Sequence, residues 1–168
     1  MGGMGEDPGL VPVEVVGVRQ QPEEEAVLVL LLEPGTDLVV PIVVGRPEGA
    51  AIVAAMAGET PPRPMTHDLL HHALVAAGEP VVRVAVTALT AGVFHAELLL
   101  LGGARVDARA SDAIAVALRF GCPVLCARAV VERAGVEVRR TTPEDEVARF
   151  RAFLDDVTAD DFEPEDEG

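Results

Sequence analysis

The chain has 168 residues, 49% of them hydrophobic, and a mean hydropathy of +0.32. Its formal net charge is −15, with 28 acidic residues against 13 basic ones, and every basic residue is an arginine. No apolar run approaches the roughly 20 residues of a membrane helix, so we expect no transmembrane span. Tight binding of nucleic acid through a broadly positive surface is excluded as well, so any contact with RNA or DNA must be local, weak, or helped by a bound cation.

The first part of the chain predicts three strands joined by short turns. Residues 10–19, 26–32 and 38–45 are rich in β-branched side chains, and the turn sequences QQPEEE and EPGTD separate them. Short links between successive strands favour an antiparallel meander. Pro41 removes a backbone donor from the third segment, which predicts an edge strand, a bulge or a strand end there.

From residue 47 the pattern changes to that of helices. Residues 47–58 are alanine-rich, open with proline and glutamate, and end at a glycine. A rigid proline-rich connector, ETPPRP at 59–64, follows. A second helix is expected over 66–77, with Gly78 placed to end it.

The remainder alternates between strands and helices. We expect a hairpin of two strands at 80–89 and 92–100, followed by a short strand at 102–108. A helix at 111–121, a last strand at 123–127 and a short helix at 129–135 complete the pattern. The expected fold class is therefore α+β, with a mixed, largely antiparallel sheet and packed helices.

We expect one domain at 10–138, between a flexible N-terminus at 1–9 and an acidic helix and disordered tail at 139–168. The acids concentrate in that tail, because residues 141–168 hold 11 acids and two arginines. The N-terminus has no basic stretch before an apolar core, so a cytoplasmic protein without a secretory signal is expected. Cys122 and Cys126 are interpreted as small buried hydrophobes. The high hydropathy favours a homo-oligomer that covers apolar surface, and no membrane contact.

Two predicted helix starts share the same chemistry, in which an arginine precedes a hydroxyl and an aspartate follows it. These residues are Arg63, Thr66 and Asp68 at the first start, and Arg109, Ser111 and Asp112 at the second. The hydroxyls predict N-caps and the acids suit the positive end of the helix dipole. The arginines are not explained by capping. They could bind phosphate beside the free N–H groups, or each could pair with a nearby aspartate and fix the loop.

The same stretches supply oxygen ligands for a hard divalent cation. Four acids could hold Mg²⁺ or Mn²⁺, namely Glu48, Asp68, Asp107 and Asp112. His67 could then act as a general acid or base. Alternatively, Asp107 is simply the outward side of a strand. His67 and His71 share a helix face, but a zinc motif is not favoured because position 68 is aspartate.

Four segments resemble the bifunctional nuclease domain family of bacteria and plants. They are VVPIVVGRPEGAAI (39–52), PPRPMTHDLL (61–70), VFHAELLL (93–100) and VDARASDAIAVALR (106–119), and the acidic segment 144–162 is similar to that of actinobacterial members. The resemblance implies an α+β domain that oligomerises, with nuclease activity on RNA and DNA. The matching positions that could carry function are Glu48, Arg63, Thr66, His67, Asp68, Asp107, Arg109, Ser111 and Asp112. The chain departs from the family at His95, where tyrosine is usual, at Ala110 (proline) and at Gly49 (alanine).

These observations favour metal-assisted hydrolysis of phosphodiesters. In that hypothesis Glu48, Asp68 and Asp112 lie near the ion and His67 does acid–base work, with Arg63, Thr66, Arg109 and Ser111 at the substrate. One alternative is a non-enzymatic oligomeric module that binds a small anion or a protein at the two helix starts. Another is a regulatory scaffold whose acidic tail makes the contacts. The enzyme hypothesis requires both helix starts to converge on one cavity.

Overall fold

A computed structural model describes residues 9–20 and 26–138 of the chain. The first three strands form the antiparallel meander that their short turns predict, with β1 (Leu10–Gln20), β2 (Val27–Leu32) and β3 (Leu38–Val44) paired in chain order. The other strands are β4 (Val81–Thr90), β5 (Val93–Leu100), β6 (Arg105–Arg109), β7 (Val124–Ala127) and β8 (Val136–Glu137). The helices are α1 (Arg46–Met56), α2 (Thr66–Ala76), α3 (Ala110–Phe120) and α4 (Arg128–Ala134).

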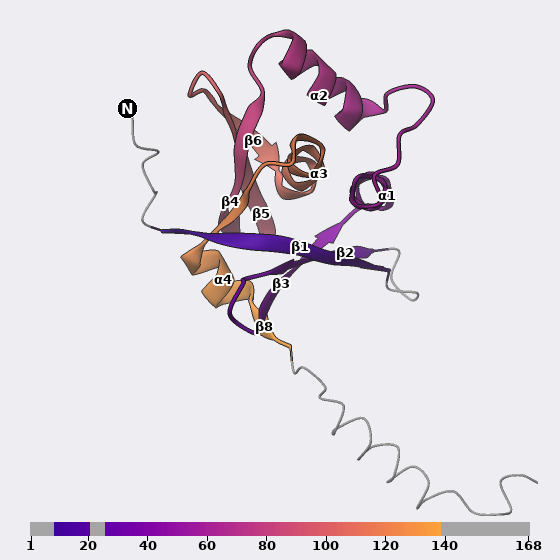
Figure 1. Ribbon diagram of the computed structural model, residues 1–168. Coiled ribbons are helices and arrows are strands. Elements are labelled where there is room, and N and C mark those ends of the chain that lie inside the picture. Colours follow the sequence, from indigo (N-terminus) through magenta and orange to yellow (C-terminus); the bar gives the residue numbers. More distant parts are fainter. Residues whose placement is uncertain (1–8, 21–25, 139–168) are drawn as a thin grey trace, which may run out of the picture. The chain divides into compact units, whose positions relative to one another are not determined.

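The strands join in one sheet with the order β6-β5-β4-β7-β1-β2-β3-β8 (Figure 1). Among the described strands, β4 and β7 are the one parallel pair of neighbours, and the chain crosses through α3 between β6 and β7. The long strand β1 connects the two halves of the sheet. Its first residues pair with β7 and its later ones with β2, with a register shift between Val15 and Gly17. The predicted α+β class is confirmed.

The edge position predicted from Pro41 is confirmed. Strand β3 pairs along its length with β2, and Pro41 faces Leu30 there. On its other side the only described strand that pairs with β3 is the two-residue strand β8, which reaches Leu38 and Val39. Pro41 therefore lies where β3 has one neighbour, so its missing N–H costs no ladder hydrogen bond. The sequence pattern did not reveal β8.

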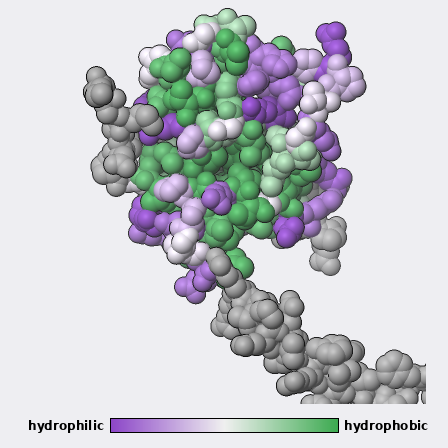
Figure 2. Space-filling view, viewed as in Figure 1, coloured by the Kyte–Doolittle hydropathy of each residue, from purple (hydrophilic) through white to green (hydrophobic). Residues whose placement is uncertain are grey.

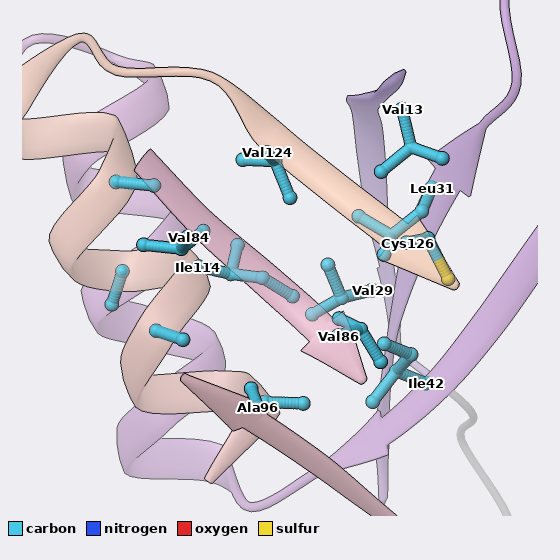
Figure 3. Close-up of a cluster of buried hydrophobic side chains, with 14 of the residues drawn as sticks. Val13, Val29, Leu31, Ile42, Val84, Val86, Ala96, Ile114, Val124 and Cys126 are labelled. Atoms are coloured by element: carbon cyan, nitrogen blue, oxygen red, sulfur yellow. The ribbon is translucent and has the colours of Figure 1, made fainter. Parts of the chain in front are cut away.

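Helix α3 is the central helix of the fold. Seven of its eleven residues are buried: Ala110, Ser111, Ala113, Ile114, Ala115, Val116 and Ala117. Ile114 lies in a cluster with Val84 and Val86 of β4 (Figure 3). Small side chains on the rest of α3 let α1 and α2 pack closely on it.

Helix α1 also approaches the sheet very closely. A Cβ atom at Gly49 would lie 2.7 Å from Cγ1 of Val27 in β2. The close spacing of α1 and β2 in this chain therefore favours glycine at this position.

Helix α2 differs from the other three, because none of its residues is buried. Leu69 is 60% exposed and Val75 is 53% exposed, although both are apolar. Figure 2 shows further hydrophobic residues over much of one face of the molecule. The apolar surface that suggested a partner copy is thus present, while the homo-oligomer itself stays a prediction.

The predicted hydroxyl caps are wrong. The residue that caps α2 is Met65 and the one that caps α3 is Arg109, so Thr66 and Ser111 lie inside the first turns. Neither N-cap residue is marked by a side-chain cap hydrogen bond of its own, although at α2 the carboxylate of Asp68 accepts from the backbone N–H of Met65. At the other end of α3 the prediction is confirmed, because Gly121 has a φ of 61° and ends the helix in the left-handed conformation.

Both cysteines are free, and burial raises the pKa of each thiol, that of Cys126 to about 11. Cys126 is fully buried, as predicted, whereas Cys122 is half-buried. Among the described residues no helix is long and apolar enough to span a membrane. The predicted terminal helix within 139–168 lies outside the described residues.

Candidate active site

A cavity of about 750 Å³ lies where α1, α2, α3 and the edge strand β6 meet. Its polar lining consists of Glu48, Thr66, His67, Asp107, Arg109 and Asp112. Its apolar wall comes from Met65, Leu70, Leu98, Val106 and Val116. Six of the nine residues singled out from the sequence therefore line one cavity, although they come from four elements.

His67 and Asp112 are joined across the cavity by a hydrogen bond. The Nε2 atom of His67, in the first turn of α2, lies 2.9 Å from Oδ1 of Asp112, in the first turn of α3. The two side chains are 16% and 30% exposed, so water reaches them only partly. A carboxylate can only accept, so Nε2 carries the proton and Nδ1 is left as the basic nitrogen of the neutral ring.

Arg109 links two acids at the rim of the cavity. Its Nε donates to Oδ2 of Asp112 at 2.7 Å, and its terminal NH2 group donates to Oε1 of Glu48 at 3.2 Å. Strand β6 ends at Arg109 and α3 begins at the next residue, which fixes the start of this side chain between sheet and helix. The side chain is nevertheless 67% exposed, so most of the guanidinium surface faces solvent.

These contacts determine the charge of Asp112. Burial alone would raise the pKa of its carboxyl, but the hydrogen bonds from Arg109 and His67 outweigh burial and lower that pKa from its ordinary value of 3.8. The hydrogen bond between Arg109 and Asp112 also raises the pKa of Arg109. Asp112 is therefore ionised at neutral pH. In this state it holds His67 in the tautomer that has its proton on Nε2 and leaves Nδ1 free to accept a proton.

Asp68 does not belong to this cavity, contrary to the expectation for a catalytic acid. Its Oδ1 accepts from Nε of Arg119 at 2.5 Å, and its Oδ2 accepts from the backbone N–H of Met65 at 2.9 Å. The hydrogen bond from Arg119 is the main reason why the pKa of Asp68 is lowered. Asp68 instead borders a second, smaller cavity of about 280 Å³ beside Arg119 and His71.

Arg119 is a key residue that the sequence did not single out. Besides Asp68 it binds the carbonyl oxygens of Ala51 in α1 and Ala115 in α3, and its side chain is only 11% exposed. One guanidinium thus ties α1, α2 and α3 together. The available signal was an arginine in the last turn of an apolar helix, where it could satisfy carbonyl groups.

Arg63 and Ser111 do not line the cavity. Arg63 is exposed in the connector before α2, and it has no ion pair with any described residue. Ser111 is buried in the first turn of α3 at 9% exposure and does not line the cavity. Their role at a substrate stays a prediction.

The four acids of the predicted metal set are not assembled into one site. Asp68 is bound to Arg119, while Glu48 and Asp112 are both bound to Arg109. Asp107 lies opposite Glu97 in the pairing of β6 with β5. Among the described residues no three His, Cys, Asp or Glu side chains are grouped so that they could hold a metal ion. The donor set therefore does not fit a carboxylate-bound divalent cation.

Comparison with known proteins gives a family and several relatives. Residues 29–139 match the bifunctional nuclease domain family. An uncharacterised protein of Mycobacterium tuberculosis is 41% identical over 159 residues, which cover 89% of this chain and 96% of the relative. A protein of Oryza sativa subsp. indica named bifunctional nuclease 1 is 27% identical over 124 residues, which cover 70% of this chain and 38% of the rice protein.

Proposed function

The chain belongs to the bifunctional nuclease domain family, and we propose that it cleaves phosphodiester bonds of nucleic acid in the cavity between α2, α3 and β6. The observation that carries this proposal is the hydrogen bond between His67 and Asp112 within 3 Å, in a cavity whose rim carries an exposed arginine. The rice relative, which is named a nuclease, supports the reaction class.

In this proposal His67 is the acid–base group. Asp112 accepts from Nε2, so Nδ1 of the neutral ring takes the proton from the attacking hydroxyl group. The carboxylate then stabilises the imidazolium that forms, because its negative charge lies next to the ring. Asp112 therefore acts by orienting His67 and balancing its charge.

Arg109 is proposed to bind the phosphate. Its guanidinium is held at one edge by Asp112 and Glu48, and its exposed surface can donate to the non-bridging oxygens. The cavity is otherwise acidic, since three carboxylates line it against this one arginine. Binding through a single guanidinium would be local and weak, which is one of the alternatives that the net charge of −15 leaves open.

This set of groups favours RNA as the substrate. RNA carries its own nucleophile, so removal of the 2′-hydroxyl proton by His67 lets the 2′-oxygen attack the phosphorus. A bond from phosphorus to the 2′-oxygen forms, the bond to the 5′-oxygen breaks, and the leaving oxygen takes a proton from water. DNA lacks that hydroxyl and needs water as the nucleophile. No step of the proposal passes through a metal ion, because in the described part of the chain the predicted acids are not grouped so that they could hold one.

The proposal is tested with highly purified full-length protein and a labelled single-stranded RNA. The wild type should cleave it, a His67→Gln variant should not, and a Glu132→Gln variant on the exposed face of α4 should cleave at the wild-type rate. Circular dichroism must show that all three are folded. Cleavage that survives in His67→Gln would disprove the role of His67. If phosphate or nucleotides raise the melting temperature of the wild type without any turnover, the chain is a binding module instead.

A further inference from the structure

The edge strand β6 presents an unpaired backbone edge beside the cavity. Within residues 9–20 and 26–138 its only strand neighbour is β5. The backbone N–H of Leu100 donates to the carbonyl oxygen of Ala104 at 2.9 Å, which turns the backbone groups of Ala104 toward β5. Because these groups alternate along a strand, those of Arg105 and Asp107 point away from β5. An exposed edge of this kind pairs readily with a further strand.

Two side chains of β6 also lack suitable neighbours among the described residues. Asp107 lies directly across from Glu97 of β5, a like-charge pair that destabilises a sheet. Arg105 binds Glu97, whereas Asp107 has no ion pair with any residue in the described part of the chain. Val106, between Arg105 and Asp107, is 42% exposed although it is apolar. This edge therefore lacks a cation opposite Asp107 and a cover for Val106.

Strand β6 of a second copy of the chain would supply both the cation opposite Asp107 and the cover for Val106. We propose that β6 pairs antiparallel with β6 of a partner subunit, about a twofold axis at Val106. In this register Asp107 lies opposite Arg105 of the partner subunit, Arg105 lies opposite the partner's Asp107, and the two Val106 side chains meet. Since Arg105 and Asp107 both present their backbone groups outward, each pair also exchanges two backbone hydrogen bonds.

The charges select this register over its nearest alternative. A twofold axis at Asp107 would place Asp107 opposite the partner's Asp107 and Arg105 opposite the partner's Arg109, so every directly opposed charged pair would be of like sign. A twofold axis at Ala108 would require residues of the first turn of α3 to pair as strand. The register at Val106 avoids both costs.

The pairing also changes the candidate active site. Val106 and Asp107 line the cavity, so the partner's β6 forms part of its rim. Arg105 of the partner subunit neutralises Asp107, one of the three carboxylates that oppose the approach of a phosphate. The proposal stands on β6 alone and does not depend on nuclease activity.

Cross-linking of the full-length chain tests the contact directly. Two strand residues that face each other without backbone hydrogen bonds have Cα atoms about 4.5 Å apart, which suits a disulfide. A Val106→Cys variant should therefore form a covalent dimer under mild oxidation, with peptide mapping showing a bond between the two Cys introduced at position 106. The wild type and a Val93→Cys variant, changed at a similarly exposed strand residue, should not. A mapped bond from position 106 to Cys122, or no bond, overturns the proposal.

A charge exchange tests the register. By sedimentation equilibrium at micromolar concentration the Asp107→Arg variant should have half the mass of the wild type, because arginines then face each other. Adding Arg105→Asp to that variant should restore the wild-type mass, and Glu132→Arg, the matched reversal on α4, should not change it. A wild type with the mass of one 17.6 kDa chain overturns the proposal. So does a mass unchanged by Asp107→Arg, or one that the double variant fails to restore.

Discussion

The Nε2 atom of His67 lies 2.9 Å from Oδ1 of Asp112, although 45 residues separate the two in the chain. Each residue belongs to the first turn of a helix, so the contact depends on how the start of α2 is held against the start of α3. That position is supported by the contact of Arg119 with Asp68, which borders a second cavity. The candidate site is therefore built from one contact inside the cavity and a second that supports it from outside.

Replacing Asp112 by asparagine should lower kcat for RNA cleavage by about 100-fold, the lower end of what general acid–base catalysis contributes. Asparagine keeps the size of the side chain but cannot balance an imidazolium. The measurement is steady-state kinetics with the folded variant. Glu48→Gln should have a smaller effect, because it removes only the longer of the two hydrogen bonds of Arg109. Equal kcat values for Asp112→Asn and the wild type would contradict the proposed mechanism.

Single-stranded RNA should be cleaved much faster than DNA of the same sequence, and cleavage should continue in EDTA. Both expectations follow from the 2′-hydroxyl group acting as nucleophile without a metal ion. The check is a comparison of both substrates in EDTA and in Mg²⁺ or Mn²⁺, with analysis of the RNA ends for 2′,3′-cyclic phosphate. Activity that requires a divalent ion, or equal rates on the two substrates, would be incompatible with this mechanism.

An Asp68→Asn variant should lose about 2 kcal/mol of unfolding free energy, since a hydrogen bond to a charged group contributes roughly 1.5–3 kcal/mol. The change weakens the contacts of this side chain with Arg119 and Met65. Urea unfolding measures the loss, with Glu132→Gln as a control that makes no comparable contact. Unchanged stability would mean that Arg119 does not anchor α2 through Asp68.

The stability of the domain should fall as the pH drops below about 4. The pKa values of Asp68 and Asp112 are lower in the folded chain than their ordinary value of 3.8. The unfolded chain therefore takes up protons first, so the stabilisation is complete above 3.8 and disappears as the pH falls through the folded pKa values. Urea midpoints measured from pH 6 to pH 3 should show this decline. The decline should be shallower in Asp68→Asn, and equal slopes would contradict the assignment.

Gly49→Ala should destabilise the domain by about 1 kcal/mol, although alanine is the better helix former. The new Cβ atom would lie 2.7 Å from Cγ1 of Val27, and overpacking of a core typically costs roughly 1–3 kcal/mol. A double-mutant cycle with Val27→Ala measures the coupling. In the Val27→Ala background the substitution should be neutral or stabilising. A loss of the same size in both backgrounds would assign the effect to something other than this contact.

Much of the fold could be predicted because the strands and helices carry strong local signals. The strands at 27–32 and 38–44 are nearly continuous apolar runs, and Gly121 ends α3 as a helix-stopping glycine should. Strand β8 could not be predicted, because two residues have no periodicity and form a strand only by reaching Leu38 and Val39. The predicted N-caps, Thr66 and Ser111, were wrong by one and two residues. The backbone geometry rather than the side-chain type determines where α2 and α3 begin.

The candidate site could be predicted only as far as the residue types. The convergence of His67, Arg109 and Asp112 agrees with the expectation that the two helix starts share a cavity. Arg63 was grouped with them because it stands near Thr66 in the sequence, but it does not line the cavity. Asp68 and Arg119 are 51 residues apart, and no local pattern indicates that they pair. The sequence thus indicated which residue types stand together at each helix start. It could not indicate which cavity each side chain faces, because that depends on tertiary contacts.

The absence of any buried residue in α2 has a consequence for motion. A helix without buried residues, held by the contact of Asp68 with Arg119 and by partly buried side chains such as Leu74, can detach while the rest of the domain stays folded. Its amide hydrogens should then exchange with solvent well before those of α3, whose side chains are mostly buried. Because His67 travels with α2, each such opening would separate the imidazole from its carboxylate, and the catalytic pair would exist only for the fraction of time that α2 is closed.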